Sequence, residues 1–175
     1  MKKNQTTFLK LCLADALIQL MDLQPYETIS VHAICDKAGI GRTTYYRHLD
    51  KRTGKEDLIV FKVLYDQKVY NERHADAVKK DSGYVLLQFI YENKRLFSTL
   101  HKNGLVTVIM RIFDEGNDWQ KEKGTSYLRA FFIYGYFGVI YEWIKYGFDE
   151  TPEQVQRHIA ETLMHAVENQ QKKNL

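Results

Sequence analysis

The sequence predicts an all-α protein in which an N-terminal module of three helices is followed by a larger helical domain. Two prolines and ten glycines in 175 residues leave room for long uninterrupted helices. Apolar residues recur at helical spacing along most of the chain, and no segment alternates at period two between turn residues as a strand would. Apolar residues make up 45% and charged residues 27%, which is ordinary for a globular protein.

The first 50 residues predict one longer helix and two short helices joined by a tight turn. The longer helix, at about 7–23, carries leucines on one face. Ser30 is suited to cap a second helix at 31–37, and Gly39 directly after it allows the left-handed backbone of a sharp reversal. A third helix is expected at about 42–49. This succession is the helix-turn-helix pattern.

The rest of the chain predicts a connecting helix and then a more aromatic helical region. The connecting helix, capped by Thr53, is expected at about 54–71. We therefore place the domain boundary after residue 53, which gives domains 1–53 and 54–175. Further helices are expected at about 84–93, 95–102, 105–113, 119–146 and 152–170.

Basic side chains concentrate around the third helix. Residues 37–55 contain six Lys or Arg and one acid, Asp50, whereas residues 61–175 contain sixteen basic and fifteen acidic side chains. A local excess of positive charge can neutralise phosphates and release their counterions. A solvated basic surface would have the same composition, so charge alone leaves both interpretations open.

Arg42 and Thr43 stand at the N-terminus of the third helix, the end that such modules insert into the major groove of DNA. Arg42 can offer two donors to a guanine, and Thr43 can contact a thymine methyl group or a phosphate. Thr28 and Ser30, near the start of the preceding helix, are suited to a phosphate contact through a hydroxyl or a backbone N–H.

The residues from Pro25 to Cys35, and then Ala38-Gly39-Ile40-Gly41-Arg42-Thr43-Thr44-Tyr45-Tyr46-Arg47-His48-Leu49, resemble the TetR family of transcriptional regulators. Lys55-Glu56-Asp57-Leu58 is similar to the beginning of that family's next helix, and the resemblance extends over residues 7–65. It implies phosphate contacts for Tyr46 and His48, and a core position for Tyr45. The full set of candidate DNA contacts is Thr28, Ser30, Arg42, Thr43, Thr44, Tyr46, Arg47, His48, Lys51 and Lys55.

The sequence departs from the family pattern at three places. Gly41 stands where the family has Ser, so the third helix lacks a side-chain cap. Leu49 replaces a Phe. The connection over residues 50–54 is about three residues longer, which puts the position of Lys55 in doubt and allows Lys51 to take over a phosphate contact.

For the second domain, the resemblance implies effector binding and pairing of the last two helices with those of a second copy. Glycine at 135 and 138 lets neighbouring helices approach closely, and Thr151 and Pro152 suit the start of the last helix. Candidate interface residues are Phe131, Gly135, Gly138, Trp143, His158, Thr162 and His165. Candidate lining residues of an effector pocket are Phe89, Phe97, Phe113, Tyr134 and Phe137, although aromatic residues at helical spacing are more often core.

These features predict a one-component regulator, a homodimer that binds palindromic operator DNA and is released from it by an unidentified small molecule. The same fold acting as a coactivator or adaptor for a protein partner is the alternative. Catalysis lacks a recognisable residue constellation, and His32 with Cys35 is a weak metal pair, so we expect no metal and no cofactor. No run approaches the roughly 20 apolar residues of a membrane span. Without a signal-peptide pattern at the start, we expect a cytoplasmic protein with reduced cysteines.

Overall fold

The structure, a computed structural model, describes residues 2–49, 54–115 and 123–173, and this part of the chain is all-α, with ten α-helices and one short 3-10 helix. It confirms the predicted fold class. The elements are α1 (Lys2–Met21), η1 (Tyr26–Thr28), α2 (Val31–Ala38), α3 (Arg42–His48), α4 (Lys55–Arg73), α5 (Ala75–Lys80), α6 (Ser82–Glu92), α7 (Lys94–Lys102), α8 (Val106–Glu115), α9 (Lys123–Lys145) and α10 (Pro152–Lys173).

The local chemistry at the ends of α2 agrees with the sequence. The Ser30 hydroxyl accepts a hydrogen bond from the Ala33 N–H at 3.1 Å, which caps the first turn. Gly39 has φ 66°, a left-handed conformation that most side chains disfavour, and it turns the chain into α3. The helix-turn-helix geometry therefore follows from two residues that the sequence identifies.

The N-terminal module packs around α1, which contacts both α2 and α4. Leu13 and Leu17 of α1, Ile34 of α2 and Leu58 of α4 are almost completely buried. One hydrophobic cluster includes these side chains and continues into α6, α7 and α8. The core thus runs across the boundary expected near residue 53, and α4 belongs to both parts.

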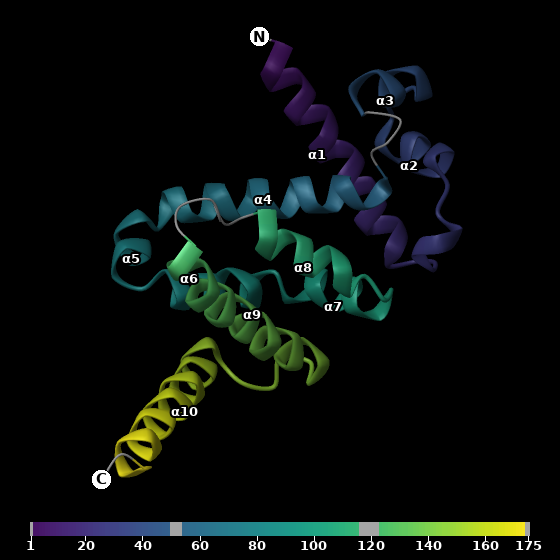
Figure 1. The fold of residues 1–175 in the computed structure, drawn as a ribbon. Coiled ribbons are helices and arrows are strands. Elements are labelled where there is room, and N and C mark those ends of the chain that lie inside the picture. The colour runs from purple at the N-terminus through teal and green to yellow at the C-terminus, as the bar shows by residue number, and fades with distance from the viewer. Residues whose placement is uncertain (1, 50–53, 116–122, 174–175) are drawn as a thin grey trace.

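In Figure 1, α4 crosses the middle of the molecule, with α1–α3 at one end and α5 at the other. The α6, α7, α8 and α9 helices lie on one side of α4, and α10 projects away from them toward the C-terminus. The first part of α10 packs on α6, where Tyr84 bonds to Glu153 and Gln156 bonds to Asp81. Beyond this contact, much of α10 has no partner helix within the described residues.

Three features differ from the sequence expectations. The α1 helix begins at Lys2, earlier than expected. The short α5 helix was missed because its sequence, Ala-Asp-Ala-Val-Lys-Lys, has no apolar stripe. Gly54 precedes α4 without a side-chain cap, and the predicted cap, Thr53, lies outside the described residues.

A polar clamp joins α7 to the loop that precedes α2. The Asn103 side chain accepts a hydrogen bond from the Tyr26 N–H at 2.9 Å and donates one to the Thr99 carbonyl at 2.9 Å. Asp22, at the end of the first helix, accepts from Arg95 at 2.7 Å and from Thr99 at 2.9 Å. The N-terminal module is therefore attached to the second domain at a place other than α4.

Candidate nucleic-acid interface

The α3 helix is held against the N-terminal module by one face and exposes the other. Tyr45 is only 4% exposed, which confirms the core position expected for it, and Leu49 is 2% exposed. The side chains of Arg42, Thr43 and Arg47 are exposed, and Tyr46 is 53% exposed. A helix anchored in this way holds its exposed side chains in fixed positions. An α-helix also fits into the major groove of B-DNA.

The residues before α3 are exposed beside it. The hydroxyl of Thr28 donates a hydrogen bond to the Pro25 carbonyl at 2.7 Å, and the hydroxyl of Ser30 is engaged as the cap of α2. The proton of the Thr28 hydroxyl is therefore already engaged, whereas the Ser30 hydroxyl keeps its own proton for a phosphate, next to the backbone N–H groups of the first turn of α2. Thr44 is half-buried, so it contributes less surface than Thr43.

Lys55 occupies an internal position instead of an outward one. Its ammonium donates to the carbonyls of Tyr26 at 2.8 Å and Ile29 at 2.7 Å, and it lies 4.2 Å from the centre of the Tyr26 ring. Burial lowers the pKa of Lys55, while Glu27 and Glu56 oppose that shift. In this conformation Lys55 ties α4 to the loop before α2, so a phosphate contact would require it to give up these bonds.

Two candidate contacts cannot be placed. Lys51 and the side chain of His48 lie outside the described residues. Their phosphate contacts stay predictions, and so does the effect of the longer connection over residues 50–54.

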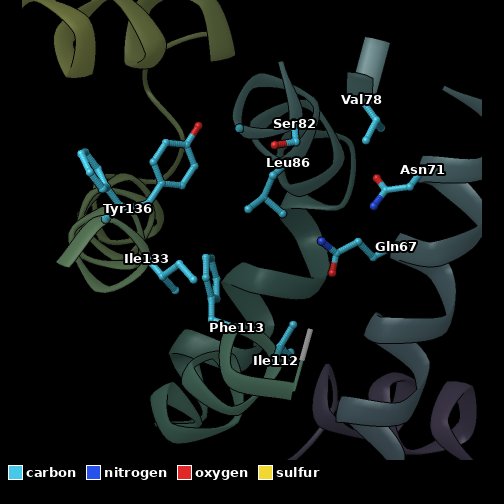
Figure 2. A pocket seen from close by; sticks show the side chains of 11 residues that line it. Gln67, Asn71, Val78, Ser82, Leu86, Ile112, Phe113, Ile133 and Tyr136 are labelled. Carbon is cyan, nitrogen blue, oxygen red and sulfur yellow. The ribbon is translucent and has the colours of Figure 1, made fainter. Parts of the chain in front are cut away.

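A cavity of about 410 Å³ opens between α4, α6, α8 and α9, with one contribution from α5 (Figure 2). Its lining residues are Gln67, Asn71, Val78, Ser82, Gly83, Leu86, Ile112, Phe113, Phe132, Ile133 and Tyr136. This volume lies within the range of small-molecule sites in proteins.

The cavity uses one of the five aromatic residues proposed to line an effector pocket, Phe113. Phe89 and Phe97 are core side chains, 3% and 1% exposed, and do not line it. The Tyr134 hydroxyl donates to Asp114 at 2.8 Å, and Phe137 packs edge-on against Phe113. The sequence missed the polar lining residues, because four unremarkable side chains on three helices (α4, α6 and α9) carry no signal until the helices pack.

A family model described as the C-terminal region of a transcriptional regulator, of the TetR type, matches residues 80–165. The chain belongs to the TetR family of transcriptional regulators. The match covers α6 to most of α10, whereas the helix-turn-helix resemblance covers residues 7–65, so separate parts of the chain agree. Comparisons with curated proteins and with solved structures gave no match.

This TetR-family chain exposes large apolar side chains along its last two helices. Phe131 is 69% exposed, and an added Cβ at Gly135 or Gly138 would meet nothing within 4 Å. Leu163 and Met164 of α10 are 43% and 63% exposed. The α9 and α10 helices therefore share an apolar surface that no other described part of the chain covers.

The remaining interface candidates divide between the surface and the interior. Trp143 is 4% exposed and donates its indole N–H to the Glu150 carbonyl at 3.1 Å, so it supports the chain from inside. His158 is exposed and lies 2.8 Å from a Glu150 carboxylate oxygen, and the Thr162 hydroxyl donates to the His158 carbonyl. The side chain of His165 lies outside the described residues.

Metal binding and membrane insertion would each need a particular arrangement of residues. Within the described ranges, no group of three or more His, Cys, Asp or Glu is arranged to hold a metal ion. No helix in the same ranges is long and apolar enough to cross a membrane.

Proposed function

We propose that this TetR-family regulator binds a palindromic operator as a homodimer and acts as a repressor that a small molecule releases. The exposed outer face of α3 carries the proposal. Arg42, Thr43, Tyr46 and Arg47 share an exposed helix whose opposite face is anchored by Tyr45 and Leu49. Arg42 and Thr43 read bases, and Tyr46 and Arg47 position the helix on phosphates.

The exposed apolar surface of α9 and α10 supports the homodimer. Large apolar side chains exposed next to one another, such as Phe131 of α9 and Leu163 of α10, are typical of an interaction site. A second copy covers it symmetrically, and the two-fold axis places two recognition helices about 34–36 Å apart for successive major grooves.

The cavity favours a small-molecule effector over a protein partner. An adaptor needs an external docking surface and no interior space, whereas this chain keeps about 410 Å³ open beside α4. Because α4 also lines the cavity and begins directly after the recognition-helix region, a ligand that prefers one position of α4 biases the spacing of the two recognition helices.

The test is selection of bound fragments from the source genome, followed by measurement of operator affinity for two arginine variants. Arg42→Ala lowers operator affinity by about tenfold or more, since a bidentate arginine contact contributes about 1–3 kcal/mol. Arg73→Ala, which removes an exposed arginine at the far end of α4, is the matched control and leaves affinity unchanged.

Salt dependence separates specific phosphate contacts from a general basic surface. We expect the logarithm of the operator affinity to fall linearly with the logarithm of salt concentration, with a shallower slope for Arg47→Ala. Equal affinity of wild type, Arg42→Ala and Tyr46→Ala for the selected fragments would rule out α3 as the recognition helix.

A further inference from the structure

We propose that the cavity between α4, α6, α8 and α9 binds an uncharged, amphipathic molecule, with an apolar body and a hydrogen-bonding group at one end. This inference rests on the proposed effector function and specifies its ligand class. It follows from which lining side chains are polar, which are apolar and which residue types are missing.

The polar side chains that line the cavity are Gln67, Asn71, Ser82 and Tyr136. In Figure 2, Gln67 and Asn71 approach from α4, Ser82 from the start of α6 and Tyr136 from α9. Among the described residues, none of these four side chains has a hydrogen-bond partner. Two amides and two hydroxyls therefore remain available as donors and acceptors for a bound molecule.

The other side chains of the lining are apolar. Leu86, Ile112, Phe113 and Ile133 are among them, and Figure 2 shows Phe113 and Ile133 close to the middle of the space. Apolar walls with a few polar groups are typical of sites that bury most of a small ligand. The apolar body of the ligand lies against these residues.

The described lining residues carry no formal charge. None of the described residues around the cavity is Asp, Glu, Lys or Arg, so a charged ligand would lose its hydration without gaining an ion pair. Asp81, the residue before Ser82, bonds to the Tyr84 N–H at 2.9 Å and to Gln156. Its negative charge further disfavours an anion near Tyr136.

The Tyr136 hydroxyl is a donor at this site. Burial, assisted by the charge of Asp81, raises the pKa of Tyr136 well above its ordinary value, so the phenol keeps its proton. The hydroxyl lies close to the backbone of α6, since a Cβ added at Gly83 would be 3.1 Å from the Tyr136 oxygen. A ligand carbonyl or hydroxyl that lies next to the Tyr136 oxygen accepts a hydrogen bond from it.

The test uses four probes with the same aromatic body and different polar groups: naphthamide, naphthoate, naphthylmethylammonium and naphthalene. Equilibrium dialysis of the full chain, without DNA, measures a Kd for each. We expect naphthamide to bind at least about tenfold more tightly than the anion or the cation. Comparable or tighter binding of naphthoate or naphthylmethylammonium, or no binding of naphthamide up to its solubility, would overturn the proposal.

Tyr136→Phe identifies the polar contact without changing the packing. It should weaken naphthamide binding about fivefold and leave naphthalene binding unchanged, because only the hydroxyl is lost. Tyr127→Phe, the same change at an exposed site of α9, is the control and changes neither Kd. Unchanged naphthamide binding in Tyr136→Phe would overturn the assignment of the Tyr136 hydroxyl as a hydrogen-bond donor to the ligand.

Operator affinity, measured separately, keeps the two hypotheses distinguishable. If naphthamide binds as described and operator affinity depends on Arg42, the proposed ligand class and the proposed regulator function both stand. If naphthamide binds but the chain has no operator, the ligand class stands and the proposed regulator function falls. If the operator is bound but naphthamide is not, the ligand class falls alone.

Discussion

Arg111 of α8 and Asp57 in the first turn of α4 form an ion pair in which the guanidinium Nη2 lies 2.6 Å from the carboxylate Oδ1. Arg111 also pairs with Glu115 at 3.0 Å, and these two carboxylates raise the pKa of the guanidinium. The next two residues, Ile112 and Phe113, line the cavity. The ion pair therefore connects the cavity wall to the helix that follows the recognition helix.

Arg111→Met should lower the free energy of unfolding by about 1 kcal/mol, measured by urea denaturation. The side chains of Arg111 and Asp57 are 39% and 29% exposed, so solvent screening keeps the contribution small. Lys79→Met breaks the Lys79–Asp76 pair, whose side chains are 78% and 94% exposed, and should change stability by less than about 0.3 kcal/mol. An equal decrease in the free energy of unfolding in the two variants would contradict a stabilising contribution from the Arg111–Asp57 ion pair.

The adjacent tyrosines of α3 should separate stability from DNA binding. Tyr45→Ala removes a ring that is 4% exposed and should cost about 3 kcal/mol or more of folding stability. Tyr46→Ala removes a ring that is 53% exposed and should change stability by less than about 1 kcal/mol while weakening operator binding. Thermal or urea unfolding measures the first effect and titration of labelled operator the second. The assignment of the two faces fails if Tyr46→Ala is the more destabilising.

Phe131→Arg should dissociate the proposed homodimer. An arginine in the apolar surface of α9 and α10 would be buried without a partner, which disfavours association strongly. Sedimentation velocity at micromolar concentration should show a monomer. Phe8→Arg is the matched control, since Phe8 is 65% and Phe131 69% exposed, and it should remain a dimer. A monomeric wild type would refute the homodimer itself.

Alkaline pH should destabilise the protein partly through Tyr26. Burial, together with the charge of Glu56, raises the pKa of Tyr26 to about 12, from about 10 in an unfolded chain. Below pH 10 both states keep the proton, and between pH 10 and 12 the unfolded state loses it first, so stability falls with rising pH. The contribution is at most about 1.4 kcal/mol per pH unit. Tyr26→Phe should make the decline of the unfolding free energy over this range shallower, and an identical pH profile in the variant would contradict the shift.

Local sequence features predicted the helices and the turn of the N-terminal module because each depends on neighbouring residues. A hydroxyl at position 30 caps α2, and the glycine at position 39 adopts the left-handed conformation required there. The glycine at position 41 leaves α3 without a side-chain cap, as expected. The core position of Tyr45 was an implication of the family resemblance, and the structure confirms it with a side chain that is 4% exposed.

Residue type did not predict the position of a side chain where its contacts come from distant parts of the chain. An exposed basic residue was expected at position 55, yet its ammonium is bound by two carbonyls from the loop before α2. Phe89 and Phe97 were candidates for lining an effector pocket, yet both fill the core, and the lining of the cavity combines Phe113 with neutral polar groups. A side chain's hydrogen-bond partners and burial depend on which helices pack beside it, and periodicity does not report that.

The sequence by itself therefore determined the all-α class, the helix-turn-helix and the residues that α3 presents, since capping, turn formation and amphipathic spacing act over a few residues. Only the tertiary structure decided the internal role of Lys55, the Arg111–Asp57 connection and the uncharged lining of the cavity. Each of these joins residues far apart in the chain, and their relative positions are set by the packing of whole helices around a common core.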